Sequence, residues 1–189
     1  MKTINFVIAA IIMMSSTAMF AKEVVVNTKK SSVEWKGSKI GGEHEGYIQL
    51  KSGSFKLKND KIVGGNFVID MTTITNTDIE NEKYNKKLVG HLKSDDFFGV
   101  EKFPTANFVV TSSTEFKDGK ATITGDLTIK GITESISFDV VRDGNDYASK
   151  INVDRSKFDV RYGSDSFFDN LGDKVIDDIF TLTIKLVVN

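Results

Sequence analysis

The chain of 189 residues contains no cysteine, one proline, one tryptophan and two histidines. Without cysteine no disulfide can form, so the hydrophobic core must stabilise the fold alone. The absence of cysteine also excludes a thiol-linked lipoprotein anchor. The formal net charge is −1, which provides no basic field to attract nucleic acid, and we expect no nucleic-acid partner.

Residue patterns typical of catalysis are also absent. His44 and His91 form no pair with metal-ligand spacing. The sequence has no Gly-x-Ser-x-Gly elbow, P-loop or dinucleotide-binding glycine pattern. Acidic doublets occur at 95–96 and 177–178, but neighbouring residues of a strand point to opposite faces and make a poor catalytic pair. We therefore expect no catalytic residues, no metal site and no cofactor.

Residues 1–21 have the layout of a secretory signal peptide: a basic start, an apolar run at 6–14, and small residues after it. Cleavage is expected after Ala21, with Ala18 as the alternative. The apolar run is about half the roughly 20 residues that a spanning helix needs. We therefore expect export to the periplasm of one domain, residues 22–189, that does not span the membrane.

Apolar and polar side chains alternate along most of that domain. In the segment 122–130, Ile123, Leu127 and Ile129 share one face, while threonines and charged residues share the other. This period of two predicts β-strands. Similar runs occur at 33–35, 48–50, 55–57, 67–71, 108–110, 135–140, 151–153, 158–162 and 180–188. Turn residues between the runs predict antiparallel hairpins, and hence a β-sandwich or an up-and-down barrel.

One segment departs from the alternation. Its apolar residues recur at helical spacing, ending with Leu88 and Leu92. Upstream, Thr77 and Glu80 fit a capping box, in which a hydroxyl and a carboxylate satisfy each other's backbone donors. The pattern predicts one helix at about 77–92.

An aromatic loop follows the expected helix. It contains Phe97, Phe98, Phe103 and Phe108, together with the single proline, Pro104. Each aromatic side chain removes a large apolar area from water, so a loop this rich in them must cover apolar material. That material is either the protein's own core or a ligand.

Three further residues have two interpretations each. Trp35 shares a strand face with Val33 and fits either the core or a wall that faces a ligand. His44 lies in the segment 41–46, whose glycines allow a close backbone approach. His91 lies near the end of the expected helix, where an imidazolium suits the helix dipole. For both histidines a structural hydrogen bond and a functional role remain open.

Several motifs resemble the YceI-like family, in order along nearly the whole of residues 23–188. They are Gly90-His-Leu-Lys-Ser-Asp-Asp-Phe-Phe98, Lys102-Phe-Pro-Thr-Ala-Asn-Phe108, Gly125-Asp-Leu-Thr-Ile-Lys-Gly-Ile-Thr133, and Asp154-Arg-Ser-Lys-Phe158 with Tyr162-Gly163 after it. An early tryptophan strand followed by His44 and Gly46 is also similar. One departure is Gly99, where the family often carries an acidic residue, so polar contacts at that position do not carry over.

The resemblance implies a fold and a function. The fold is a lipocalin-like eight-stranded antiparallel β-barrel with one helical excursion and an aromatic loop. The function is non-catalytic binding of a polyisoprenoid or a similar long-chain amphiphile in an apolar lumen, in an exported bacterial protein. The residues expected around the chain of the lipid are Trp35, Phe97, Phe98, Phe103, Phe108, Leu127, Ile129 and Phe158. His44, His91 or Asp96 would meet a polar head group.

Alternatives remain at this stage. An outer-membrane barrel would also alternate, with its apolar face outward, although an interrupting helix and one tryptophan argue against it. A small hydrolase or isomerase would use His44 or His91 as its base. A stress-response protein would dock on an envelope partner through an apolar patch. The sequence does not decide whether the protein forms a homodimer.

Overall fold

The structure is a computed structural model that describes residues 20–189. Most of the expected signal peptide, residues 1–21, lies outside the described residues. The first strand begins at Lys22, directly after the first expected cleavage site.

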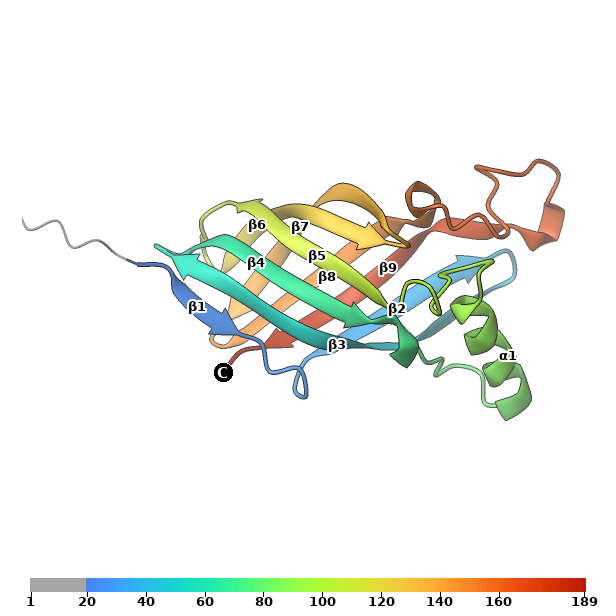
Figure 1. Cartoon of the computed structure of the whole chain (residues 1–189), viewed down its shortest axis with the longest axis horizontal. Helices are drawn as coiled ribbons and strands as arrows, with labels where there is room; N and C mark the ends of the chain where they lie inside the picture. Colours follow the sequence, from blue (N-terminus) through green and yellow to red (C-terminus); the bar gives the residue numbers. More distant parts are fainter. Residues whose placement is uncertain (1–19) are drawn as a thin grey trace, which may run out of the picture.

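Nine antiparallel strands form the sheet (Figure 1). They are β1 Lys22–Val25, β2 Ser32–Lys39, β3 Gly42–Lys58, β4 Lys61–Asp70, β5 Thr105–Ser113, β6 Lys120–Ile129, β7 Ile132–Asp143, β8 Asp146–Asp154 and β9 Ile176–Val187. Strands β2 to β9 close into an eight-stranded barrel, because β3 pairs with both β2 and β4 and β2 pairs with β9. The short β1 extends the line of β2 along the far half of β3. The predicted barrel is therefore confirmed.

Tight turns join the strands at the positions that the sequence predicts. Asn59 and Asp60, between β3 and β4, both have positive φ angles, as do Lys130 and Gly131 between β6 and β7. Two consecutive residues of this kind match the right-handed twist of paired strands.

The predicted helix exists, but its start and its cap were wrong. Helix α1 spans Glu82–Lys93, and its N-cap is Asn81, whose side chain accepts hydrogen bonds from the backbone N–H groups of Lys83 and Tyr84. Thr77 instead donates its backbone N–H to the carbonyl of Glu45 on β3, at 2.9 Å. The backbone at Thr77 is thus held along the sheet, so the helix can begin only after the chain has left it.

The predicted strand at 158–162 is also wrong. The 3-10 helix η2, Arg155–Phe158, follows β8, and Asp159 then adopts a left-handed conformation with φ of 57°. Two further 3-10 turns, η1 Met71–Thr73 and η3 Gly172–Lys174, follow β4 and precede β9. Apolar spacing at 158–162 resembled a strand because two buried residues, Phe158 and Val160, are separated by one position.

Apolar side chains point into the barrel and polar ones point out. On β6, for example, Ile123, Leu127 and Ile129 are buried, whereas Thr122 is exposed. This is the reverse of the arrangement in an outer-membrane barrel, whose lipid-facing side is apolar. Among residues 20–189, no helix has the length and hydropathy required to span a bilayer.

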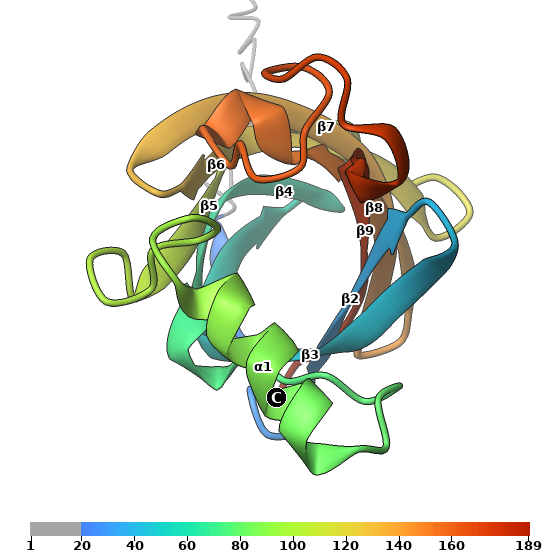
Figure 2. The same ribbon diagram turned by 90° about the vertical axis from the view of Figure 1, so that its right-hand side faces the viewer.

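The two ends of the barrel differ (Figure 2). At one end, α1 lies along one side of the rim, facing the segments around η2 and η3 on the opposite side. At the other end the interior is packed: Phe55 and Phe116 both contact Tyr147 edge to face, with ring centroids 5.1 and 6.0 Å apart. The Arg142 guanidinium lies 4.5 Å above the Phe116 ring. We call these the α1 end and the closed end.

Candidate ligand-binding lumen

A long apolar cavity occupies the barrel interior. Its volume is about 220 Å³. Its lining comes from every barrel strand and from the aromatic loop, and nearly all of it is aliphatic or aromatic. Such a space suits a hydrocarbon rather than a polar substrate.

Inward-facing side chains of β9 show that the interior is not packed like an ordinary core. Phe180, Leu182, Ile184 and Leu186 all line the lumen, yet each is only partly buried. Interiors without a cavity are close-packed. These residues therefore present apolar surface to the lumen, which a ligand could cover.

The structure separates the four phenylalanines of the aromatic loop. Phe97, Phe98 and Phe108 line the lumen, whereas Phe103 is absent from its lining. Phe97 and Phe98 contact each other edge to face at 5.1 Å, and Phe108 packs 5.3 Å from Phe138 of β7. The ring of Phe103 instead lies against the turn at Gly131, outside the lumen.

The remaining apolar residues of the predicted set also divide into two groups. Trp35, Leu127 and Ile129 line the lumen. Trp35 donates its indole N–H to the carbonyl of Thr75 at 2.9 Å, which fixes the ring. Phe158 is 1% exposed and belongs to the packed core under η2, so it seals the barrel rather than facing the cavity.

His91 lies at the rim of the α1 end. Its ring contacts Tyr162 at 4.3 Å and Phe97 at 5.8 Å between centroids, edge to face in both cases. It thereby connects α1 to the segment that follows η2, across the barrel opening. His91 does not itself line the lumen, and neither does the exposed Asp96, which precedes Phe97 in the aromatic loop.

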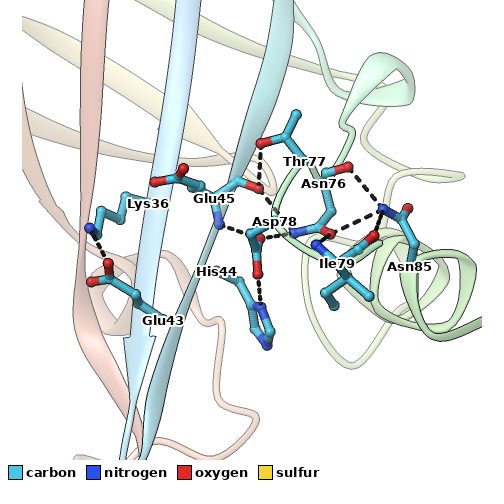
Figure 3. Close-up of polar contacts among 9 residues, drawn as sticks. All are labelled: Lys36, Glu43, His44, Glu45, Asn76, Thr77, Asp78, Ile79 and Asn85. Carbon is cyan, nitrogen blue, oxygen red and sulfur yellow. Dashed lines mark hydrogen bonds and ion pairs between the residues drawn. The ribbon is translucent and has the colours of Figure 1, made fainter. Parts of the chain in front are cut away.

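His44 belongs to a polar network on the outer surface (Figure 3). Its Nδ1 lies 2.7 Å from Asp78 Oδ2, and Asp78 Oδ1 accepts the backbone N–H of Glu45 at 2.9 Å. Burial would raise the pKa of Asp78, but hydrogen bonds from Glu45, His44 and Asn76 outweigh it and lower that pKa. Asn76 is held in turn by Asn85 of α1, at 3.1 Å. The network ties β3 to the start of α1, away from the lumen.

Among residues 20–189, Arg155 is the one charged side chain that is buried against the lumen, and its sequence context did not indicate this. It is 2% exposed. Burial lowers the pKa of its guanidinium, and the carboxylates of Asp178 and Asp177 oppose that shift. Its guanidinium lies 5.5 Å from the Phe97 ring centroid. The Asp-Arg-Ser motif contained this residue, but nothing in the sequence showed that its charge would be buried.

Arg155 donates four hydrogen bonds to backbone carbonyls. Nε donates to the carbonyl of Asp177 at 3.0 Å, and Nη1 donates to those of Val160 and Tyr162 at 2.8 and 2.9 Å. Nη2 donates to the carbonyl of Ile176 at 2.8 Å and lies 3.2 Å from Asp178 Oδ1. Arg155 therefore joins η2 to the start of β9 through four hydrogen bonds and an ion pair with Asp178.

Among the described residues no group of three or more His, Asp or Glu side chains is arranged to hold a metal ion. The two histidines lie in separate places, and neither reaches the lumen. What the arrangement can do is enclose an apolar chain.

A closed antiparallel barrel with an apolar lumen defines a class of small-ligand-binding β-barrels. Within it, residues 25–188 match the YceI-like domain. The chain belongs to the YceI-like family.

Two relatives are similar to this chain in sequence. A UPF0312 protein of Shewanella denitrificans is 32% identical over 64% of this chain and 62% of its own length. The chain thus matches less than two thirds of that protein. A UPF0312 protein of Vibrio parahaemolyticus is 28% identical over 79% of this chain and 84% of its own length.

Solved structures share the fold. Burkholderia cenocepacia BcnA has a TM-score of 0.64 at 23% identity, over 87% of this chain and 99% of that one. A polyisoprenoid binding domain from Saccharophagus degradans has a TM-score of 0.59 at 13% identity, over 88% and 97%. A Campylobacter jejuni YceI protein has a TM-score of 0.52 at 18% identity, over 100% and 93%.

Proposed function

We propose that this protein binds a polyisoprenoid or similar long-chain amphiphile in its lumen and sequesters or carries it in the periplasm without catalysis. The observation that carries the proposal is the apolar lumen, whose β9 wall exposes Phe180, Leu182, Ile184 and Leu186 to the cavity. The structural likeness to a polyisoprenoid binding domain supports it. The basic, apolar and small-residue pattern of residues 1–21 supports export.

The energetics favour long chains over short ones. Each buried methylene contributes about 0.8 kcal/mol, so one isoprene unit contributes roughly 3 kcal/mol. Association costs on the order of 4–15 kcal/mol in lost freedom. One or two units would therefore bind weakly, whereas several would bind tightly. A lumen lined almost entirely by apolar side chains discriminates by length rather than by hydrogen bonding.

The head group would remain at the rim of the α1 end. His91 and Tyr162 lie there beside the lumen-lining Phe97, and Asp96 is exposed next to it. Polar groups at a wet rim suit the polar end of an amphiphile, because a buried head group without partners would cost free energy.

Filling the lumen tests the proposal. Ile184→Trp places a larger side chain in the cavity, whereas Thr183→Trp adds the same side chain on the exposed outer face. In titrations with a fluorescent polyene fatty acid, the first variant should bind about tenfold or more weakly, and the second should bind like the wild type. Equal binding by both variants would contradict a lumenal site.

Substituting both histidines distinguishes the enzyme alternative from lipid binding. A His44→Ala/His91→Ala double variant should leave lipid binding mostly intact, because neither side chain lines the lumen and only the head-group contact of His91 is lost. Turnover of a small apolar substrate by the wild type, lost in that variant, would favour the hydrolase or isomerase instead.

A further inference from the structure

The barrel wall is discontinuous between β7 and β8. Within the described chain, the β7–β8 ladder consists of Asp143↔Asp146, Arg142↔Tyr147 and Val141↔Ala148. Both strands continue well beyond this point, β7 back to Ile132 and β8 on to Asp154. Their other edges are paired throughout these lengths, β7 with β6 and β8 with β9. We call the unpaired stretch, residues 133–140 of β7 and 149–154 of β8, the β7–β8 seam.

Side chains bound the seam at its two ends. Near the ladder, Ser149 donates its hydroxyl to the carbonyl of Asp139 at 2.6 Å. At the opposite end, Lys130 Nζ donates to the carbonyl of Asp159 at 2.8 Å, which connects the β6–β7 turn to η2. Between these two contacts the facing strand edges carry no ladder pairs.

The inner side of the seam is continuous with the lumen. Ile136 and Phe138 of β7 and Ser149, Ile151 and Val153 of β8 all line the cavity. Ile136 and Phe138 are only partly buried, although both point inward. An apolar path therefore leads from the lumen to the unpaired stretch of wall.

Opening the seam costs less than opening the wall elsewhere. Parting two laddered strands breaks a row of backbone hydrogen bonds, each with a net contribution of about 0.5–1.5 kcal/mol. In the seam only side-chain contacts must move. Opening the α1 end would disrupt packed side chains, because Leu92 and Phe97 are buried there and His91 contacts Tyr162. Segments with few backbone pairings open first.

We propose that the β7–β8 seam is a lateral portal through which the hydrocarbon chain of the ligand enters and leaves the lumen. This inference rests on the proposed function. A chain that enters sideways can be threaded segment by segment, while its polar end stays in water outside the barrel.

The absence of cysteine allows a direct test. The register at Val141↔Ala148, continued along both strands, brings Ser137 opposite Asn152, and both are exposed. In a Ser137→Cys/Asn152→Cys variant, a short bis-methanethiosulfonate reagent would bridge the seam, because each cysteine thiolate displaces a methanesulfinate and forms a reducible disulfide to the reagent. Stopped-flow mixing with the fluorescent polyene fatty acid should show uptake and release slowed by about tenfold or more. The equilibrium affinity should stay within about twofold, and a reductant should restore the rates.

A matched control shares one of the two positions. Thr124 pairs with Ser137 in the intact β6–β7 ladder, with their hydroxyls 2.7 Å apart. Bridging a Thr124→Cys/Ser137→Cys variant should leave the rates of lipid uptake and release unchanged, because β6 and β7 are already joined by a continuous ladder. Equal rates before and after bridging the β7–β8 seam, or equal slowing in both variants, would overturn the portal. If the wild type takes up no lipid at all, the proposed function fails and the portal fails with it.

Discussion

At the scale of single residues, the alternation of apolar and polar residues predicts whether a side chain points into the barrel. It does not predict what that side chain contacts there. Phe158 and Phe180 are both apolar residues in segments with strand-like spacing. Phe158 is 1% exposed beneath η2, whereas Phe180 is partly buried and faces the cavity. Whether an inward side chain meets another side chain or open lumen depends on how far the opposite wall lies. A period of two carries no information about that distance.

Arg155 shows how a buried charge can be structural. Replacing it with methionine removes the partner of four backbone carbonyls and of Asp178. Because Asp178 would then be left as an uncompensated, largely buried charge, we expect Arg155→Met to lower the free energy of unfolding by about 3–5 kcal/mol. Urea denaturation measures the change.

Arg161→Met is the matched control for this substitution. The Arg161 side chain is 60% exposed and pairs with Asp159 at the surface, where such pairs contribute about 0–1 kcal/mol. Equal destabilisation by the two variants would contradict the role assigned to the buried guanidinium.

The lowered pKa of Asp78 predicts that its contribution to the free energy of unfolding depends on pH. A carboxyl whose pKa is lower in the folded than in the unfolded protein stabilises the fold above its ordinary pKa, near 4, and that stabilisation is lost as the pH falls through the folded value. Asp78→Asn should therefore cost about 1–2 kcal/mol at neutral pH, through weaker hydrogen bonds. The cost should shrink below about pH 4.

Urea denaturation of the wild type and of Asp78→Asn between about pH 3 and 7 checks this prediction. Asp96→Asn, at an exposed carboxylate of the aromatic loop, should differ from the wild type by less than about 0.5 kcal/mol. A difference between wild type and Asp78→Asn that is constant across the pH range would contradict the assigned role of Asp78.

At the scale of elements, the strands and hairpins could be predicted, and the boundaries near α1 could not. The segment from Ile74 to Thr77 is held against β3 by backbone hydrogen bonds, including Thr75 N–H to the Tyr47 carbonyl at 2.9 Å. Gly46 permits this approach, since a Cβ there would lie 1.9 Å from the Thr75 carbonyl oxygen. The glycines around His44 did predict a close backbone approach. Which segment approaches depends on tertiary contacts. These contacts hold Thr77 against β3, so the expected capping box does not form.

The position of the true N-cap can be tested directly. Asn81→Ala removes the acceptor for the N–H groups of Lys83 and Tyr84, and we expect a loss of about 1 kcal/mol in the free energy of unfolding. Glu80→Ala, which would break the predicted capping box, should change it by less than about 0.5 kcal/mol. Thermal unfolding followed by circular dichroism compares the two variants, and the opposite ranking would restore Thr77 as the helix start.

At the scale of the whole molecule, the two ends of the barrel stabilise the fold, and the wall between them provides the binding surface. The closed end is packed with aromatic rings and capped by Arg142, and the α1 end is held by Arg155 and by the polar network of His44 and Asp78. Between them the wall is lined with apolar side chains around a cavity. A core that leaves such a cavity forgoes close packing. The apolar surface kept open in this way is what a long-chain ligand would cover.

Native mass spectrometry of the purified full-length protein, followed by lipid extraction, tests the central claim most directly. The account predicts folded protein that carries, or takes up on incubation with a long-chain prenol, one lipid molecule whose mass is released on denaturation. Lumen-filled Ile184→Trp should carry less of it than Thr183→Trp. A folded wild-type protein that carries no lipid and takes up none would contradict the account.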